Sequence, residues 1–152
     1  MLHRHPILSF VTVLYLAAVA WITLGPQPLD AHGVDLLERV IAVLQRHAAT
    51  DWVTYSRVEF AANIAMFVPM GLFFLLLMGR RYWWLAVLLC LVATVSIETA
   101  QQGIPGRISD PRDIVSNTFG GAVGVIVGLV LTWRPGAARR RAAAERAAER
   151  AA

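Results

Sequence analysis

Four continuous apolar segments divide the chain, and none of them alternates between apolar and polar positions. They cover residues 7–24, 60–78, 83–100 and 114–133. A helix needs about 20 residues to cross the hydrocarbon core of a bilayer, and each segment comes close to that length. A membrane barrel would instead need short alternating strands. The pattern therefore predicts an all-α integral membrane protein with four transmembrane helices.

The first apolar segment has an alternative interpretation as a cleaved signal peptide. A short basic stretch at residues 3–5 precedes it, and residues 18–20, Ala-Val-Ala, resemble a processing site. The apolar run continues past Ala20 to Leu24, however, and this length favours a retained span.

A different periodicity is found in the first loop. Apolar residues recur there at steps of three and four, with charged and amide residues between them, at Val34, Leu37, Ile41, Leu44 and Ala48. This spacing is typical of an amphipathic helix at a membrane interface. Its apolar face would cover either the outer leaflet or the mouth of the bundle, and the sequence does not decide between them.

Arginines mark one side of the predicted membrane. They stand at Arg4, at Arg80 and Arg81 in the turn between the second and third spans, and at residues 139–141. Because basic residues accumulate in cytoplasmic loops, both termini are expected in the cytoplasm and the two longer loops outside. We accordingly divide the chain into a membrane domain, residues 1–136, and a charged cytoplasmic tail, residues 137–152.

Composition agrees with a lipid environment. Of the 152 residues, 57% are hydrophobic and 16% are charged, a balance that a small water-soluble domain does not need. The formal net charge is +4, but no basic face with interleaved aromatic residues is visible outside the membrane flanks. Membrane lipid is therefore the expected partner, and nucleic acid is not.

Polar residues within the spans fall at one predicted depth. They lie where the second span begins, where the third ends and where the fourth begins: Glu59 and Asn63, Glu98 and Gln101, and Asp113 and Asn117. Spans that alternate in direction bring these three ends to the same, outer, face. The short loop between the third and fourth spans adds Arg107 and Asp110.

The spacing within each pair puts both side chains on one helical face, so the polar faces can converge. An unpaired carboxylate in hydrocarbon costs about 2.5 to 3.5 kcal/mol on insertion scales, so Glu98 is expected to face partners inside the bundle. Arg107 is the favoured partner. In an enzyme, Glu98 or Asp113 would serve as general acid or base, while Arg107 would hold a phosphate or carboxylate. Catalysis and binding without turnover both remain open.

Several of these residues also have structural interpretations. Asp110 precedes Pro111 and suits the N-cap of the fourth span. Asn63 and Asn117 could serve only as hydrogen bonds between helices. Small residues at Gly120, Gly124 and Gly128 form a face that predicts close helix packing, either within the chain or in a homo-oligomer.

No metal ion or cofactor is predicted. The histidines at positions 3, 5, 32 and 47 lie outside the spans and lack the spacing of metal ligands. One alternative is an oxygen-ligated divalent ion at Glu98, Asp110 and Asp113. The sequence has no catalytic triad motif, Gly-rich phosphate loop or HExxH helix.

Two dense blocks of residues carry a family resemblance. They comprise Glu59, Phe60, Asn63, Phe67, Pro69 and Gly71, then Ser96, Glu98, Gln101, Arg107, Asp110, Asp113, Asn117, Gly120, Gly121 and Gly124. In these residues the chain resembles the VanZ-like membrane proteins over about residues 8–131.

The resemblance implies a protein of the bacterial cytoplasmic membrane that acts on the cell envelope. The family takes its name from a member that confers resistance to the glycopeptide teicoplanin. We therefore expect the polar cluster to bind or modify an envelope lipid or a cell-wall precursor group. The alternative is a non-catalytic membrane protein that partners other envelope proteins.

Overall fold

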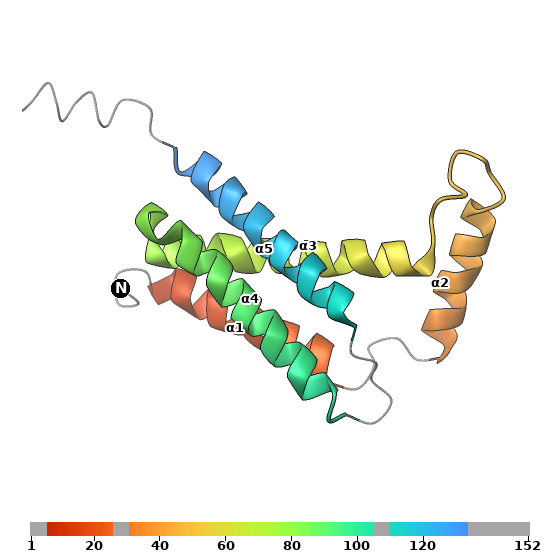
Figure 1. Cartoon of the computed structure of the whole chain (residues 1–152), viewed down its shortest axis with the longest axis horizontal. Helices are drawn as coiled ribbons and strands as arrows, with labels where there is room; N and C mark the ends of the chain where they lie inside the picture. The colour runs from red at the N-terminus through yellow and green to blue at the C-terminus, as the bar shows by residue number, and fades with distance from the viewer. Residues whose placement is uncertain (1–5, 26–30, 105–109, 134–152) are drawn as a thin grey trace, which may run out of the picture.

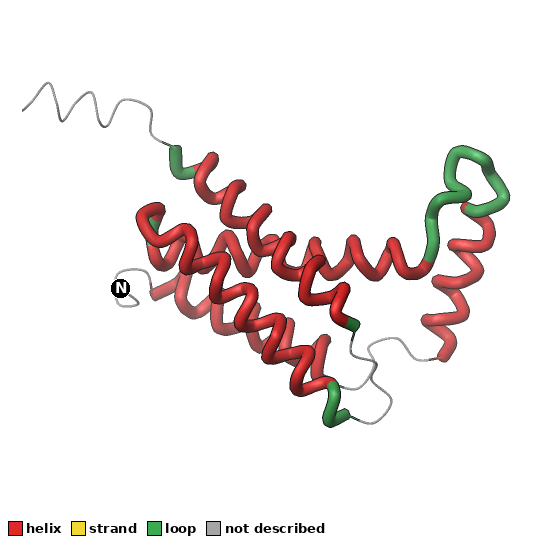
Figure 2. Tube along the Cα trace, viewed as in Figure 1, coloured by secondary structure: helices red, strands yellow, loops and turns green. Residues whose placement is uncertain are grey.

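The described parts of the chain are almost entirely helical. The computed structural model describes residues 6–25, 31–104 and 110–133, except the side chains of 31–35. No strand is found among these residues (Figure 2). The helices are α1 (Pro6–Leu24), α2 (Ala31–Leu44), α3 (Tyr55–Met78), α4 (Trp83–Gln101) and α5 (Pro111–Leu131), with a one-turn 3-10 helix, η2 (Arg80–Tyr82), before α4.

Four of these helices are long and apolar enough to cross a membrane: α1, α3, α4 together with η2, and α5. The predicted fold class is therefore confirmed, and the chain is a multi-pass membrane protein. The predicted charged tail, residues 137–152, and the arginines at position 4 and at 139–141 lie outside the described residues.

Local capping sets the ends of two spans. Helix α3 begins at Tyr55, five residues before the apolar run, because the Thr54 hydroxyl accepts a hydrogen bond from the Arg57 amide. Helix α5 begins at Pro111, where the Asp110 carboxylate accepts from the Arg112 amide at 2.9 Å. The apolar segments predicted the spans well, but polar caps lengthened both of them at their N-terminal ends.

The four long helices pack side by side, with α5 crossing α3 (Figure 1). The α3–α5 contact is the most extensive in the molecule, and α4 packs against both of these helices. Buried side chains form two clusters, one around Val19, Phe67, Met70 and Cys90 and one around Leu75, Ala86 and Val125.

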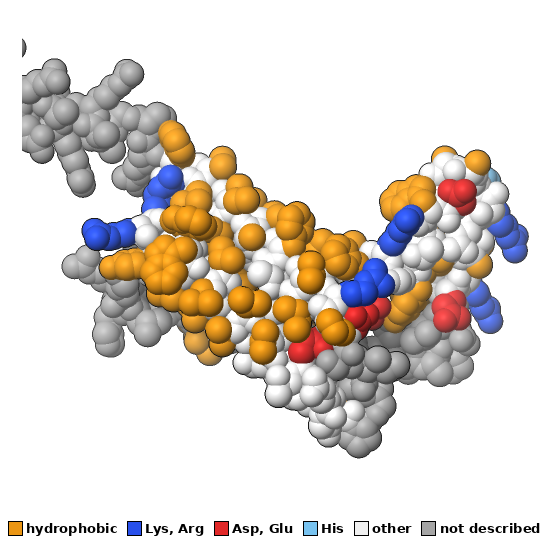
Figure 3. Space-filling model, in the orientation of Figure 1, with side chains coloured by type: hydrophobic (Ala, Val, Ile, Leu, Met, Phe, Trp, Pro, Cys, Tyr) orange, Lys and Arg blue, Asp and Glu red, His pale blue; other side chains and the backbone are white. Residues whose placement is uncertain are grey.

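The outer surface of the bundle is apolar, as a surface in lipid must be. Phe119, Ile126 and Leu131 on α5 are 57%, 59% and 72% exposed. In the space-filling view, hydrophobic side chains cover the body of the bundle (Figure 3). Acidic side chains in that view gather at the end where α3 and α5 begin and on the α2 side of the molecule.

Glycines allow α3 and α5 to touch through their backbones. A Cβ atom on Gly120 would overlap the Ile64 backbone, and one on Gly124 would overlap the Val68 backbone. Gly128 packs against the Leu75 side chain. The predicted small-residue face thus lies against a helix of the same chain. Pairing with a second copy stays a prediction.

Helix α1 is held to the bundle by a few specific contacts. Its Tyr15 hydroxyl donates a hydrogen bond to the Met66 carbonyl of α3 at 2.5 Å. The Tyr15 ring also meets Phe73 edge-on at 5.5 Å.

Helix α2 stands apart from the four long helices (Figure 1). The predicted periodicity extended to Ala48, but the helix ends at Leu44. The reason is local: the Thr50 hydroxyl donates to the Leu44 carbonyl at 2.5 Å, and this is the acceptor that a continuing helix would offer to residue 48. Ile41 is buried on this helix, whereas Val40 and Val43 are exposed.

Candidate functional site

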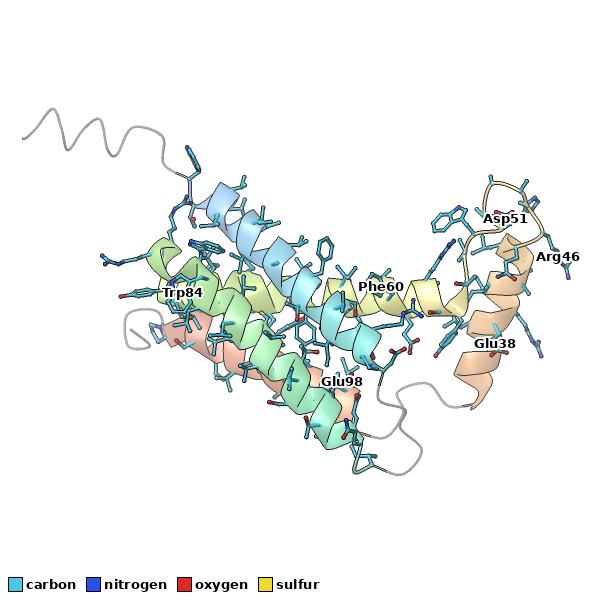
Figure 4. All side chains as sticks on the ribbon, viewed as in Figure 1. Glu38, Arg46, Asp51, Phe60, Trp84 and Glu98 are labelled. Atoms are coloured by element: carbon cyan, nitrogen blue, oxygen red, sulfur yellow. The ribbon has the colours of Figure 1, made fainter. Side chains whose placement is uncertain are left out.

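Four helix ends meet at one end of the bundle, which we call the polar end. They are the C-termini of α1 and α4 and the N-terminal parts of α3 and α5. Glu98 lies there, on the last turns of α4, while Trp84 marks the opposite end of the same helix (Figure 4). The alternating directions of the spans, read from the sequence, therefore brought the polar residues to one level.

A partly open cavity of about 220 Å³ lies at the polar end. All four spans contribute to its lining, which consists of Ile22, Thr23, Glu59, Ala62, Asn63, Met66, Ile97, Glu98, Gln101, Asp113 and Asn117. Six of the eight residues predicted for the polar cluster thus share one cavity. The other two, Arg107 and Asp110, are described below.

The contact between α3 and α5 at this end is polar. The Asn63 side-chain amide donates a hydrogen bond to Oδ1 of Asp113 at 2.7 Å. The negative charges of Glu98, Glu59 and Asp110 all act on the same Asp113 carboxylate. The Asp113 carboxylate is therefore repelled by three neighbouring carboxylates.

Asn117 lies one turn deeper on α5 and is almost fully buried, at 3% exposed. Its Nδ2 donates to the Thr94 hydroxyl of α4 at 2.9 Å. Its Oδ1 is also buried and has no hydrogen-bond partner within the described part of the chain. A buried amide oxygen without a donor is costly, so this atom is suited to meet a donor from outside the protein.

Gln101 connects α4 to α1. Its side-chain amide donates to the Thr23 carbonyl at 3.0 Å, and the residue is 9% exposed. This bond satisfies a carbonyl in the last turn of α1, where a helix has no intrahelical donor for it. Gln101 therefore fixes the position of α1 and forms part of the cavity wall.

The two glutamates differ in exposure. Glu98 is 4% exposed, as its predicted position inside the bundle requires, whereas Glu59 is exposed at the cavity edge. Arg107, the predicted partner of Glu98, lies outside the described residues, so the ion pair stays a prediction.

Asp110 has a structural role: its carboxylate caps α5, and the residue does not line the cavity. Within the described ranges, Glu98, Asp110 and Asp113 do not come together as a group that could hold a metal ion. The guanidinium of Arg112 points to α3 and donates to the Ser56 hydroxyl at 2.9 Å.

Sequence reasoning missed two partners of the cluster, Thr23 and Thr94. Thr94 stands four residues before Glu98 and therefore lies on the same face of α4, which was an available signal. Thr23 acts through its backbone carbonyl, for which the sequence carries no signal. The apolar wall, including Ile22, Met66 and Ile97, was also missed because such residues look like ordinary span residues.

Comparison with known proteins gives one result that bears on identity. No curated protein and no solved structure matches the chain significantly. The model of the VanZ/LLP1 family matches residues 11–132, which include most of α1, all of α3, α4 and α5, and every residue of the polar cavity. On this match the chain belongs to the VanZ/LLP1 family of membrane proteins.

Proposed function

We propose that the polar cavity binds the polar group of an envelope lipid or of a lipid-linked cell-wall precursor. One observation carries this proposal: carboxylates, amides and apolar side chains from all four spans line a single cavity at one end of the bundle. A polar group could contact Asp113 and Asn117 while an attached acyl chain follows Ile22, Met66 and Ile97. Concave sites with an apolar wall and a few convergent polar groups are typical of ligand binding.

The cavity faces the outer side of a bacterial cytoplasmic membrane in this proposal. The turn that carries Arg80 and Arg81 lies at the opposite end of the bundle, and basic turns favour the cytoplasmic side. Both termini are then cytoplasmic. A C-terminal alkaline phosphatase fusion should be inactive, because that reporter works only outside the cytoplasm. An active fusion would place the cavity on the inner side.

The family resemblance supports the same location, because teicoplanin-class drugs act on cell-wall precursors at the outer surface. A protein that binds such a precursor, or alters the lipid around it, would change drug access. If the bound group is also modified, Glu98 or Asp113 would transfer the proton as general base or acid.

Mass spectrometry tests the proposal in two steps. Native spectra of the purified protein should show a co-purified lipid, and Asp113→Asn should lose it, whereas Gly103→Ala should keep it. Gly103 is a matched control because a Cβ there meets only the Ala100 carbonyl, at an ordinary 3.5 Å.

Total lipid and muropeptide profiles of cells with and without the protein then separate the modes of action. A new or missing mass identifies a modifying enzyme, and unchanged profiles with a bound lipid identify a binding protein. If Asp113→Asn retained all bound lipid, the cavity would not be the binding site. An interaction with other envelope proteins would then be the better explanation.

A further inference from the structure

The hydrogen-bond donors that line the cavity are directed at the protein itself. The amide nitrogens of Asn63, Gln101 and Asn117 donate to Asp113, the Thr23 carbonyl and Thr94. The Thr23 hydroxyl donates to the Val19 carbonyl at 2.8 Å. Each of these groups thus donates at least one N–H or O–H to an acceptor of the protein itself.

Acceptors, by contrast, are in excess around the cavity. The carboxylates of Glu59 and Asp113 line it, and an ionised carboxylate offers about four acceptor sites, of which the Asn63 amide occupies one on Asp113. The described lining residues include no lysine or arginine. The buried Oδ1 of Asn117 is a second, independent sign, because this neutral acceptor has no donor in the described structure.

We propose that the cavity receives a protonated primary amine, such as the ammonium of an aminoalkyl headgroup or of a cell-wall peptide. The proposal rests on the proposed function and names the chemistry of its ligand. An ammonium brings three donors and a positive charge, which complement the Asn117 oxygen and the carboxylates. A phosphate brings acceptors and negative charge, and both are disfavoured beside Asp113 and Glu59.

The lining also distinguishes a primary amine from a quaternary one. Proteins recognise trimethylammonium groups by surrounding them with aromatic rings, because such groups have no N–H to donate. None of the described residues that line the cavity is aromatic. The cavity offers oxygen acceptors instead, and these need a ligand that carries N–H bonds.

Nanodiscs of defined composition test this chemistry. The protein is placed in phosphatidylcholine containing a minor fraction of phosphatidylethanolamine or of phosphatidylglycerol, and the lipids that stay bound are counted by native mass spectrometry. We expect phosphatidylethanolamine to exceed phosphatidylcholine by about tenfold, relative to their amounts in the disc, because one charge-assisted hydrogen bond supports that ratio. The two headgroups share a phosphate and differ only in the amine.

Two variants assign the preference to the cavity. Asn117→Leu, which removes the buried acceptor, should abolish most of the amine preference. Glu59→Gln should reduce it by about two- to fivefold, since an exposed charge contributes less. Glu59 is exposed and its change should leave folding intact, so it decides the question if Asn117→Leu does not fold. Ser116→Ala is the matched control, because Ser116 is fully buried beside Asn117 but does not line the cavity.

Each outcome has a defined meaning. Equal binding of phosphatidylethanolamine and phosphatidylcholine, or a preference for phosphatidylglycerol, would overturn the amine assignment. The proposed function would survive that result if the bound lipid still depended on Asp113. An amine preference that persists in both Asn117→Leu and Glu59→Gln would place the amine outside the cavity and also overturn the proposal.

A competition experiment then separates the two sources of the amine. Displacement of the bound lipid by free ethanolamine would show that a soluble or peptide-borne amine suffices. Resistance to free ethanolamine, together with the headgroup preference, would show that the amine must belong to a lipid. Both results support an ammonium in the cavity.

Discussion

Helices α3 and α5 meet in two ways along one interface. Around Gly120 and Gly124 their backbones touch, and no side chain separates them. About two turns before Gly120 on α5, at the polar end, the contact passes through the side chains of Asn63 and Asp113. The same two helices therefore form both the tightest packing in the molecule and part of the wall of its cavity.

The difference between the glycine contact and the polar contact explains how a small bundle makes room for a ligand. Two helices that cross diverge on either side of their closest approach, and glycines place that approach below the cavity. The space that opens at the polar end is wide enough for side chains with hydrogen-bonding groups. We infer that backbone contact supplies the stability of the α3–α5 pair, while the polar contact supplies its chemistry.

The largest expected effect comes from the packed region. Gly124→Leu should destabilise the bundle by about 3 kcal/mol or more, because its side chain would overlap the Val68 backbone. Thermal unfolding in detergent and the amount of protein in the membrane measure this loss. Gly103→Ala should behave like the wild type, since its Cβ meets only an ordinary contact. A stable Gly124→Leu variant would contradict the role given to backbone contact.

The polar region should respond in the opposite manner. Asp113→Asn and Glu98→Gln should each abolish ligand binding and cellular function while the amount of folded protein stays unchanged. Both substitutions keep the shape of the side chain and remove its charge. Lipid binding by native mass spectrometry, set against thermal unfolding of the same samples, gives the measurement. Full function in Glu98→Gln would show that its charge is not used.

The cap of α5 lies between these extremes. Asp110→Ala should lower stability by about 1 kcal/mol through loss of the bond to the Arg112 amide, whereas Asp110→Ser, which keeps an acceptor, should lower it by a few tenths of that. Thermal unfolding of the two variants measures the difference. If the two variants were equally stable and lost function to the same extent, the Asp110 charge would instead belong to the site.

The smallest effect is expected at the end opposite the cavity. Arg80 donates to the Leu129 carbonyl and to the Thr132 hydroxyl, and its guanidinium lies 5.6 Å from the Trp133 ring centre. Arg80→Gln should cost about 0.5 to 1 kcal/mol, a value typical of an exposed cation–π contact. Ligand binding should not change. If binding fell while stability held, the two ends would be coupled.

The sequence predicted the spans and most of the cavity for one reason. Apolar length and the three- to four-residue spacing of polar groups are both properties of a single helix, and alternating directions then fix which ends meet. Glu59, Asn63, Glu98, Gln101, Asp113 and Asn117 could all be placed in this way.

Other features depend on contacts between helices or on single turns. The Thr23 carbonyl joins the site only because α1 lies beside the end of α4. The early end of α2 depends on one Thr50 hydroxyl bond, which periodicity does not reveal. Asp110 had two equally good interpretations, and its geometry supports the cap.

The contacts of α1 also determine the order in which the molecule assembles. The Tyr15 bond to Met66 joins residues 51 apart, and the Gln101 bond to Thr23 joins residues 78 apart. At about 5 to 20 residues per second, a ribosome needs roughly 4 to 16 s to make the longer interval. Helix α1 therefore has no partner in the bilayer until α3 is made, and its bond to α4 waits for the longer interval. It is also the most apolar of the four spans, which suits a helix that must be stable in lipid before any neighbour arrives.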